Sequence, residues 1–196
     1  MSVGGKPAWT VPVGVIVELA LAPGSAVDHE AVDRLDRAAD EEGAIRAALR
    51  MLERRAHSRT ELGRKLRGKG HGASAVDAAL MRLDRLGLND DAAFAEAYVT
   101  ARAGRGRGAA RLRRDLAALG VAEPMIARAI ATLAETGSPD PWQRTLEQAT
   151  RRAQAMRGLP RQVRQRRLAA FLARRGFTGM AAQAAIHRLI GGPPDG

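Results

Sequence analysis

The sequence predicts an all-α protein made of three tandem three-helix repeats, because five apolar or glycine positions recur at fixed offsets. Within each copy the apolar residues stand at the spacing of a helix face that packs on a core. One such unit is marginally stable alone, so we expect the repeats to stack into an elongated, curved molecule. The recurring positions are Leu62, Leu66, Gly70, Leu80 and Leu83; Leu112, Leu116, Gly120, Ile130 and Leu133; and Leu168, Leu172, Gly176, Ile186 and Leu189.

Residues 1–43 are predicted to form an acidic N-terminal leader that contains a short strand, a turn and a helix. A β-branched residue at every second position from 13 to 17 indicates the strand. A Pro-Gly pair at 23–24 marks the turn, and the helix is expected from Asp28. Three basic and eight acidic side chains give this segment a formal net charge of −5.

Helical repeat 1 is predicted over residues 44–88. Its second helix opens at the run 58–61 (SRTE), a capping box in which the Ser58 hydroxyl accepts the amide three residues on. Gly70 is expected to end this helix, because glycine readily adopts the left-handed conformation of a helix C-terminus. The third helix carries Leu80 and Leu83 on its apolar face.

Helical repeat 2 is predicted over residues 89–136 and helical repeat 3 over residues 137–190. Residues 191–196 are rich in Gly and Pro and are expected to be a flexible tail. Asp90 and Asp91 place negative charge at the start of a helix, where the helix dipole favours it.

The sequence lacks the residue patterns that are typical of catalytic or metal-binding sites. There is no cysteine, which excludes disulfides and thiolate metal sites, and the four histidines show no metal-binding spacing. No P-loop and no Ser-His-Asp pattern occurs either. We therefore expect no catalytic residues, no metal, no cofactor and no enzyme activity. No apolar run reaches the ~18–20 residues of a membrane span, so a soluble, cytoplasmic protein without a membrane partner is expected.

Positive charge is the strongest functional signal. Residues 44–196 carry 29 basic and 13 acidic side chains, and the basic ones cluster around the second helix of each repeat. Arginine binds phosphate or carboxylate with two parallel hydrogen bonds. Alternatively, the basic residues could form a solvent-exposed surface that only keeps the protein soluble. Such a surface would normally carry both positive and negative side chains. The predicted partner- or DNA-contacting residues are Arg54, Arg55, Arg59, Arg64, Lys65, Arg67, Lys69, Arg105, Arg107, Arg111, Arg114, Arg161, Arg164 and Arg167.

Three kinds of partner fit a cationic surface: nucleic acid, an acidic protein face or an anionic membrane. Aromatic residues are only 3% of the chain, so a stacking platform for single strands is not indicated. A non-specific DNA-binding or nucleoid-associated protein remains an alternative, and its affinity would fall steeply with salt. A sequence-specific helix-turn-helix regulator is a weaker alternative, because no repeat shows a clear recognition helix.

Several runs resemble the RecX family. They are LNDDAAFA at 88–95 and RGRGAARL at 105–112 in repeat 2, with ALRML at 48–52 and SRTEL at 58–62 in repeat 1. The likeness covers about residues 15–190 and is weaker in repeat 3.

The resemblance implies a regulator of the RecA recombinase, with functions in DNA recombination, DNA repair and the SOS response. Family members are curved molecules of three tandem three-helix repeats that bind RecA filaments on single-stranded DNA. They block filament growth and reduce ATP hydrolysis and strand exchange, and they have no catalytic residues. The expected partners are therefore the RecA filament and single-stranded DNA, which would be bound directly or through RecA. The protein is expected to be a monomer.

Overall fold

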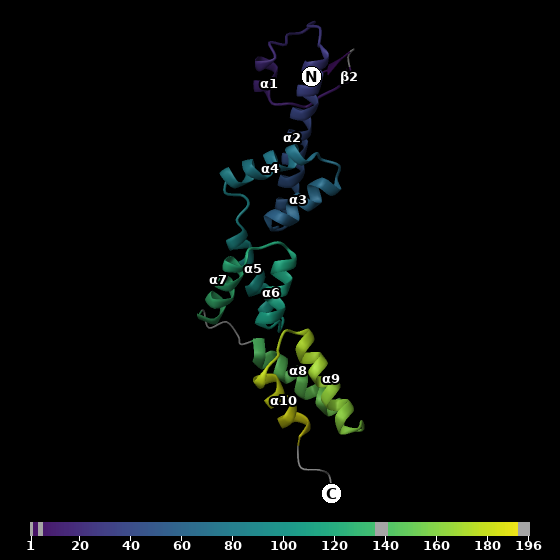
Figure 1. Ribbon diagram of the computed structural model, residues 1–196, viewed down its shortest axis with the longest axis vertical. Coiled ribbons are helices and arrows are strands. Elements are labelled where there is room, and N and C mark those ends of the chain that lie inside the picture. Colours follow the sequence, from purple (N-terminus) through teal and green to yellow (C-terminus); the bar gives the residue numbers. More distant parts are fainter. Residues whose placement is uncertain (1, 4–5, 136–140, 192–196) are drawn as a thin grey trace. The chain divides into compact units, whose positions relative to one another are not determined.

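The computed structural model describes residues 2–3, 6–135 and 141–191 and forms two compact units, residues 1–91 and 92–196 (Figure 1). We call them unit 1 and unit 2. The predicted all-α class with three three-helix repeats is confirmed. The predicted boundary between repeats 2 and 3, at 136/137, lies outside the described residues, as do residues 192–196 of the expected tail.

Unit 1 contains repeat 1 and the N-terminal segment. Two-residue strands pair antiparallel before the first helix. The C-terminal half of its longest helix packs against two shorter helices, which completes the repeat (Figure 1). Its elements are β1 (Ser2–Val3), β2 (Lys6–Pro7), α1 (Val13–Glu18), α2 (His29–Arg54), α3 (Arg59–Gly68) and α4 (Ala73–Arg85).

Unit 2 contains repeats 2 and 3, each with its own three helices. Its first helix begins at Asp91, which is the last residue of unit 1. Its elements are α5 (Asp91–Ala103), α6 (Ala109–Ala118), α7 (Glu123–Glu135), α8 (Pro141–Ala155), α9 (Arg161–Arg174) and α10 (Met180–Ile190).

The strand predicted at residues 13–17 is wrong, because these residues form helix α1. Val13 and Val17 are 77% and 72% exposed, so no neighbouring surface selects a pleated arrangement for them. Strand propensity mostly reflects packing on such a surface. Without a partner strand, a helix satisfies the backbone hydrogen bonds locally.

The leader helix and the first helix of repeat 1 are one continuous helix, α2, of 26 residues. It begins as expected after Asp28, whose carboxylate accepts a hydrogen bond from the amide of Ala31 at 2.8 Å. The predicted segment boundary at 43/44 lies inside this helix. The helix continues because its buried face continues: Leu35 is fully buried before the boundary and Ala44 after it.

The second helix of each repeat, which is α3, α6 or α9, ends in the same turn. The glycine after the helix is left-handed in every copy, with φ of +93° at Gly70, +81° at Gly120 and +86° at Gly176. The amides of this glycine and of the next residue donate to carbonyls of the last helical turn, as His71 does to Leu66 at 3.3 Å. This is the Schellman motif, and it confirms that the repeated glycines end these helices.

The repeated apolar positions build three separate cores. Two leucines four residues apart on each second helix point into the core, and each is at most 1% exposed. The first and third helices of the repeat close the core around them. These central leucines are Leu62, Leu66, Leu112, Leu116, Leu168 and Leu172.

Within unit 2, the turn before α6 contacts the end of α9. The amide of Gly108 donates to the carbonyl of Arg175 at 2.7 Å, and the guanidinium of Arg175 donates to the carbonyl of Arg105 at 3.3 Å. The hydroxyl of Thr145, which is fully buried, donates to the carbonyl of Gly106 at 3.1 Å. Repeats 2 and 3 therefore share hydrogen bonds that leave no room for a side chain at Gly108.

We expect Gly108→Ala to destabilise unit 2. A Cβ atom at this position would lie 2.8 Å from the carbonyl oxygen of Gly176, a backbone atom. The clash should lower the free energy of unfolding by about 2 kcal/mol, measured by urea denaturation. Gly158→Ala is the matched control, since nothing lies within 4 Å of its Cβ position. Equal stability of the two variants would contradict the close packing of repeats 2 and 3.

Candidate polyanion-binding surface

The fourteen predicted contact residues divide into two groups according to their carboxylate partners. Arg55, Arg59, Lys65, Arg107 and Arg111 form ion pairs. The others form none with the described residues, and they are Arg54, Arg64, Arg67, Lys69, Arg105, Arg114, Arg161, Arg164 and Arg167.

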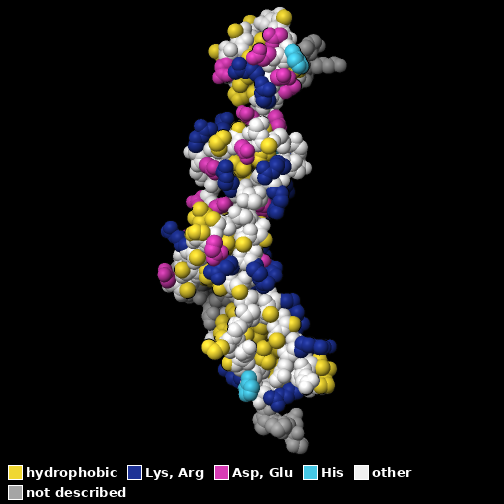
Figure 2. Space-filling model, viewed as in Figure 1, with side chains coloured by type: hydrophobic (Ala, Val, Ile, Leu, Met, Phe, Trp, Pro, Cys, Tyr) yellow, Lys and Arg dark blue, Asp and Glu magenta, His cyan; other side chains and the backbone are white. Residues whose placement is uncertain are grey.

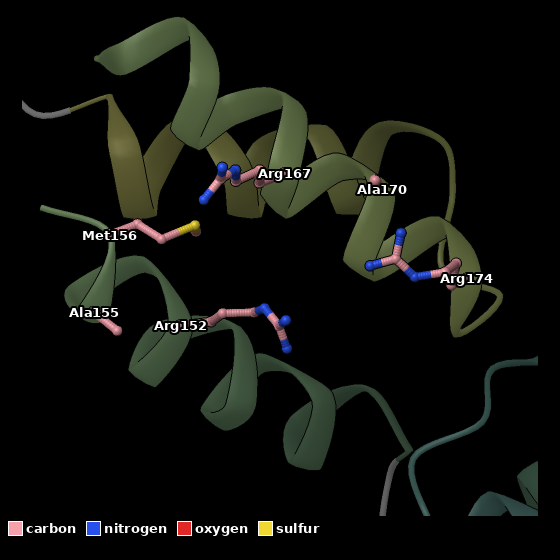
Figure 3. Close-up of a pocket in the computed structure, with 6 residues that line it drawn as sticks. All are labelled: Arg152, Ala155, Met156, Arg167, Ala170 and Arg174. Atoms are coloured by element: carbon pink, nitrogen blue, oxygen red, sulfur yellow. The ribbon is translucent and has the colours of Figure 1, made fainter. Parts of the chain in front are cut away.

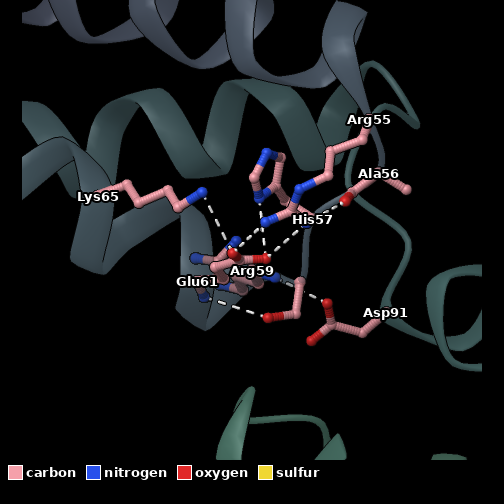
Figure 4. Close-up of polar contacts among 8 residues, drawn as sticks. Arg55, Ala56, His57, Arg59, Glu61, Lys65 and Asp91 are labelled. Carbon is pink, nitrogen blue, oxygen red and sulfur yellow. Dashed lines mark hydrogen bonds and ion pairs between the residues drawn. The ribbon is translucent and has the colours of Figure 1, made fainter. Parts of the chain in front are cut away.

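In unit 1 two of the paired residues, Arg55 and Lys65, gather around one carboxylate, that of Glu61 (Figure 4). Glu61 lies in the first turn of α3, and its side chain is 6% exposed. Arg55 approaches it at 2.6 Å from the end of α2, and Lys65 approaches at 3.2 Å from the next turn of α3. Nδ1 of His57 lies 2.8 Å from its second oxygen. This cluster holds the connection between α2 and α3 in place.

The surroundings of Glu61 shift two pKa values. Burial alone raises the pKa of Glu61, but hydrogen bonds from Arg55, His57 and Lys65 outweigh it and lower the pKa to about 2. Burial lowers the pKa of His57, and this outweighs the opposite effect of its hydrogen bond to Glu61. At neutral pH the pair therefore consists of a carboxylate and an uncharged imidazole.

The start of α3 is held by two further acceptors. The hydroxyl of Ser58 accepts the amide of Glu61 at 3.1 Å, which confirms the predicted cap. The carboxylate of Asp91 accepts the amide of Arg59 at 2.8 Å, and the Arg59 guanidinium pairs with Asp84. Asp91 lies in the first turn of α5, as its sequence context suggested, but its contact across 32 residues was not foreseen. Arg59 thus serves the local structure.

In unit 2 one carboxylate pairs with two of the predicted contact residues of repeat 2. Asp115 lies 2.5 Å from Arg107 and 2.8 Å from Arg111. Asp115 follows directly after the basic residues between 102 and 114, so the clustering of positive charge did not by itself predict this pairing. The four-residue spacing of Arg111 and Asp115 on a helix was the available signal.

Repeat 3 carries the largest excess of unpaired positive charge. Residues 141–191 contain eleven arginines and one acidic residue, Glu147. No ion pair is formed by the described side chains of this stretch. On the face shown in Figure 2, basic but not acidic side chains lie over α8–α10.

A pocket of about 570 Å³ lies between α8 and α9 (Figure 3). Of the predicted contact residues only Arg167 lines it, and two further arginines join it there. These two are not among the predicted contact residues, because proximity between different helices is not visible in the spacing. The lining residues are Arg152, Ala155, Met156, Arg167, Ala170 and Arg174.

Metal-binding geometry is not found in the described ranges, where no three His, Asp or Glu side chains come close enough to share an ion. Of the helices described, none combines the length and the apolar character needed to cross a membrane.

We expect Glu61→Gln to lower the free energy of unfolding at neutral pH by roughly 3 kcal/mol. The folded-state pKa of Glu61 lies below its ordinary value of 4.5, so its stabilising effect is present above pH 4.5 and lost as the pH falls towards 2. Urea denaturation between pH 7 and pH 3 should show the difference between wild type and variant shrinking on acidification. Glu53→Gln, at an exposed position on α2, is the control. A pH-independent difference would contradict the ionic role of Glu61.

Family models match all three repeats. The model described as RecX, first three-helix domain, matches residues 44–83. The second three-helix domain matches residues 90–130, and the third matches residues 139–186.

Named relatives extend the match. The chain is 38% identical over 159 residues to the regulatory protein RecX of Xanthomonas oryzae pv. oryzae (strain MAFF 311018), which covers 81% of this chain and 96% of that relative. It is 40% identical over 140 residues to the regulatory protein RecX of Stenotrophomonas maltophilia (strain R551-3), covering 71% of this chain and 82% of that relative.

Solved structures show the same fold. A crystal structure of regulatory protein RecX superposes with a TM-score of 0.71 at 21% identity, covering 96% of this chain and 89% of that one. RecX from Lactobacillus salivarius gives a TM-score of 0.63 at 20% identity, covering 76% of this chain and 96% of that one. With its three matched domains and these relatives, the chain belongs to the RecX family of regulatory proteins.

Proposed function

We propose that this protein binds the RecA filament on single-stranded DNA and limits its growth, ATP hydrolysis and strand exchange. The observation that carries the proposal is the set of basic side chains, present in all three repeats, that have no carboxylate partner among the described residues. The resemblance of the sequence supplies the identity of the partner. We further propose that the protein acts as a cytoplasmic monomer in DNA recombination and repair.

The unpaired arginines are the better candidates for the contact. A guanidinium that already pairs with a carboxylate, such as Arg107 with Asp115, must give up that pair before it binds another anion. Arg64, Arg67 and Arg114 are exposed, and within the described ranges they have no such pair to break. Binding of a polyanion to these side chains releases counterions, so the affinity should fall with salt.

A regulatory function agrees with the chemistry of the described residues. The buried ionisable groups Glu61 and His57 are engaged with Arg55 and Lys65 around the start of α3. They hold a connection between two helices. The pocket between α8 and α9, which three arginines line, has no acid or nucleophile in its lining. Binding rather than bond-making is the activity that this arrangement supports.

Wild-type protein is expected to suppress the DNA-dependent ATPase of RecA at sub-stoichiometric concentrations. A protein that binds a filament acts on many subunits through one contact, so equimolar amounts are not needed. The measurement is a titration of RecA on single-stranded DNA with this protein. An unchanged ATPase rate at equimolar protein would refute the proposed function.

Reversing two unpaired charges should weaken the inhibition. We expect Arg64→Glu with Arg67→Glu to raise the half-inhibiting concentration roughly tenfold, because two attractive contacts become repulsive. The charge-matched control is Arg37→Glu with Arg50→Glu, two exposed positions on α2 that also form no ion pair with the residues that the structure describes. Equal loss in both variants would show that net charge, rather than the α3 surface, determines the inhibition.

Non-specific DNA binding is the second candidate, and the unneutralised arginines of α8–α10 favour it. It differs from the first in one respect, namely that RecA is not needed for tight binding. Filter binding to single-stranded DNA at physiological salt, with and without RecA, separates the two functions. Tight binding without RecA, together with an unchanged ATPase rate, would favour the second candidate.

A further inference from the structure

We propose that the pocket between α8 and α9 binds one nucleotide unit, with its phosphate on the arginines and its base against the guanidinium plane of Arg152. The inference deepens the proposed function by assigning a strand-binding site to repeat 3. It rests on three observations, which concern the charge of the pocket, its shape and the support of Arg152 by an aromatic ring.

The charge of the pocket favours an anion. Arg152, Arg167 and Arg174 line it together, and none of them pairs with a carboxylate of the described residues. Glu147 is the one acidic residue between 141 and 191, and it does not line the pocket. Three guanidinium groups gathered without a counter-charge repel one another. A bound phosphate relieves this repulsion and accepts two parallel hydrogen bonds from a guanidinium.

The shape of the pocket suits a small anion with an apolar part. Figure 3 shows Arg152 reaching in from α8 and Arg167 and Arg174 from α9, with Met156 at one end. Small apolar side chains complete the lining, at Ala155 and Ala170. The volume of about 570 Å³ lies in the range of sites that hold small ligands. The phosphate of a nucleotide can thus meet Arg167 and Arg174 while the base lies beside the apolar lining, against the guanidinium of Arg152.

Arg152 is supported in a way that favours stacking. Its guanidinium carbon lies 5.0 Å from the ring centroid of Phe171, a cation–π contact. Phe171 itself is only 6% exposed, so a ligand meets the guanidinium rather than the ring. Nucleobases stack on guanidinium planes as well as on aromatic side chains. This arrangement provides a stacking surface in a chain that exposes few aromatic residues.

The test compares binding of two labelled strands of equal length, an oligothymidylate and an abasic strand with the same phosphates, by fluorescence anisotropy. Arg167→Gln with Arg174→Gln should weaken oligothymidylate binding about tenfold and reduce the salt slope by about two. The matched control, Arg166→Gln with Arg188→Gln, removes two exposed charges that do not line the pocket and should change binding much less.

A third variant separates stacking from charge. Arg152→Lys keeps the positive charge but removes the planar guanidinium. It should reduce the preference of the protein for oligothymidylate over the abasic strand and leave abasic binding nearly unchanged. Thermal denaturation of all variants checks that repeat 3 remains folded. Equal affinity losses in the pocket pair and the control pair, or an unchanged preference in Arg152→Lys, would overturn the proposal.

Competition identifies the source of the nucleotide. Displacement of the strand by an oligonucleotide but not by free thymidine triphosphate supports a strand site. Displacement by both at similar concentrations supports the nucleotide chemistry but assigns the pocket to a free nucleotide. If a glutamate-rich peptide displaces the labelled strand as effectively as an oligonucleotide does, the proposal is overturned in favour of an acidic protein partner.

The RecA ATPase assay keeps this inference distinct from the proposed function. If wild type inhibits RecA while the pocket variants bind both strands like the control, only the pocket assignment fails. If the pocket variants lose strand binding but wild type does not inhibit RecA, only the proposed function fails.

Discussion

Burial of two leucines four residues apart, on the second helix of every repeat, is the interaction on which the structure depends. Leu62 with Leu66 and the corresponding pairs in α6 and α9 are almost completely buried, and the other two helices of each repeat pack around them. The left-handed glycine that follows turns the chain back towards the third helix. Because the core uses only one face of the second helix, the opposite face is free to carry arginine.

Carboxylates decide how that positive charge is used. Glu61 is buried and Asp115 is partly buried, and each binds two basic side chains, which then stabilise the repeat from within. A basic residue in such a pair maintains the fold, whereas an unpaired one such as Arg64 keeps its charge available to a partner. In repeat 3 acids are almost absent, so its arginines remain available for a ligand.

The helical repeats could be predicted because their periodicity and their glycines act locally. Ser58 caps α3 as expected, and the repeated leucines form the cores. The prediction failed at Val13–Val17, where β-branched residues without a partner strand form a helix. It also missed the contact of Asp91 with Arg59, since an acceptor 32 residues away leaves no mark in the local pattern.

The sequence by itself determined the fold class, the repeat and the excess of positive charge, because these follow from residue type and spacing along one helix. Only the tertiary structure decided which charges remain unpaired, because some ion pairs, such as that of Arg59 with Asp84, join different helices. It alone brought Arg152, Arg167 and Arg174 around one pocket and placed Arg152 over Phe171. Such contacts depend on how two helices pack, and the packing is set by the whole repeat rather than by either helix.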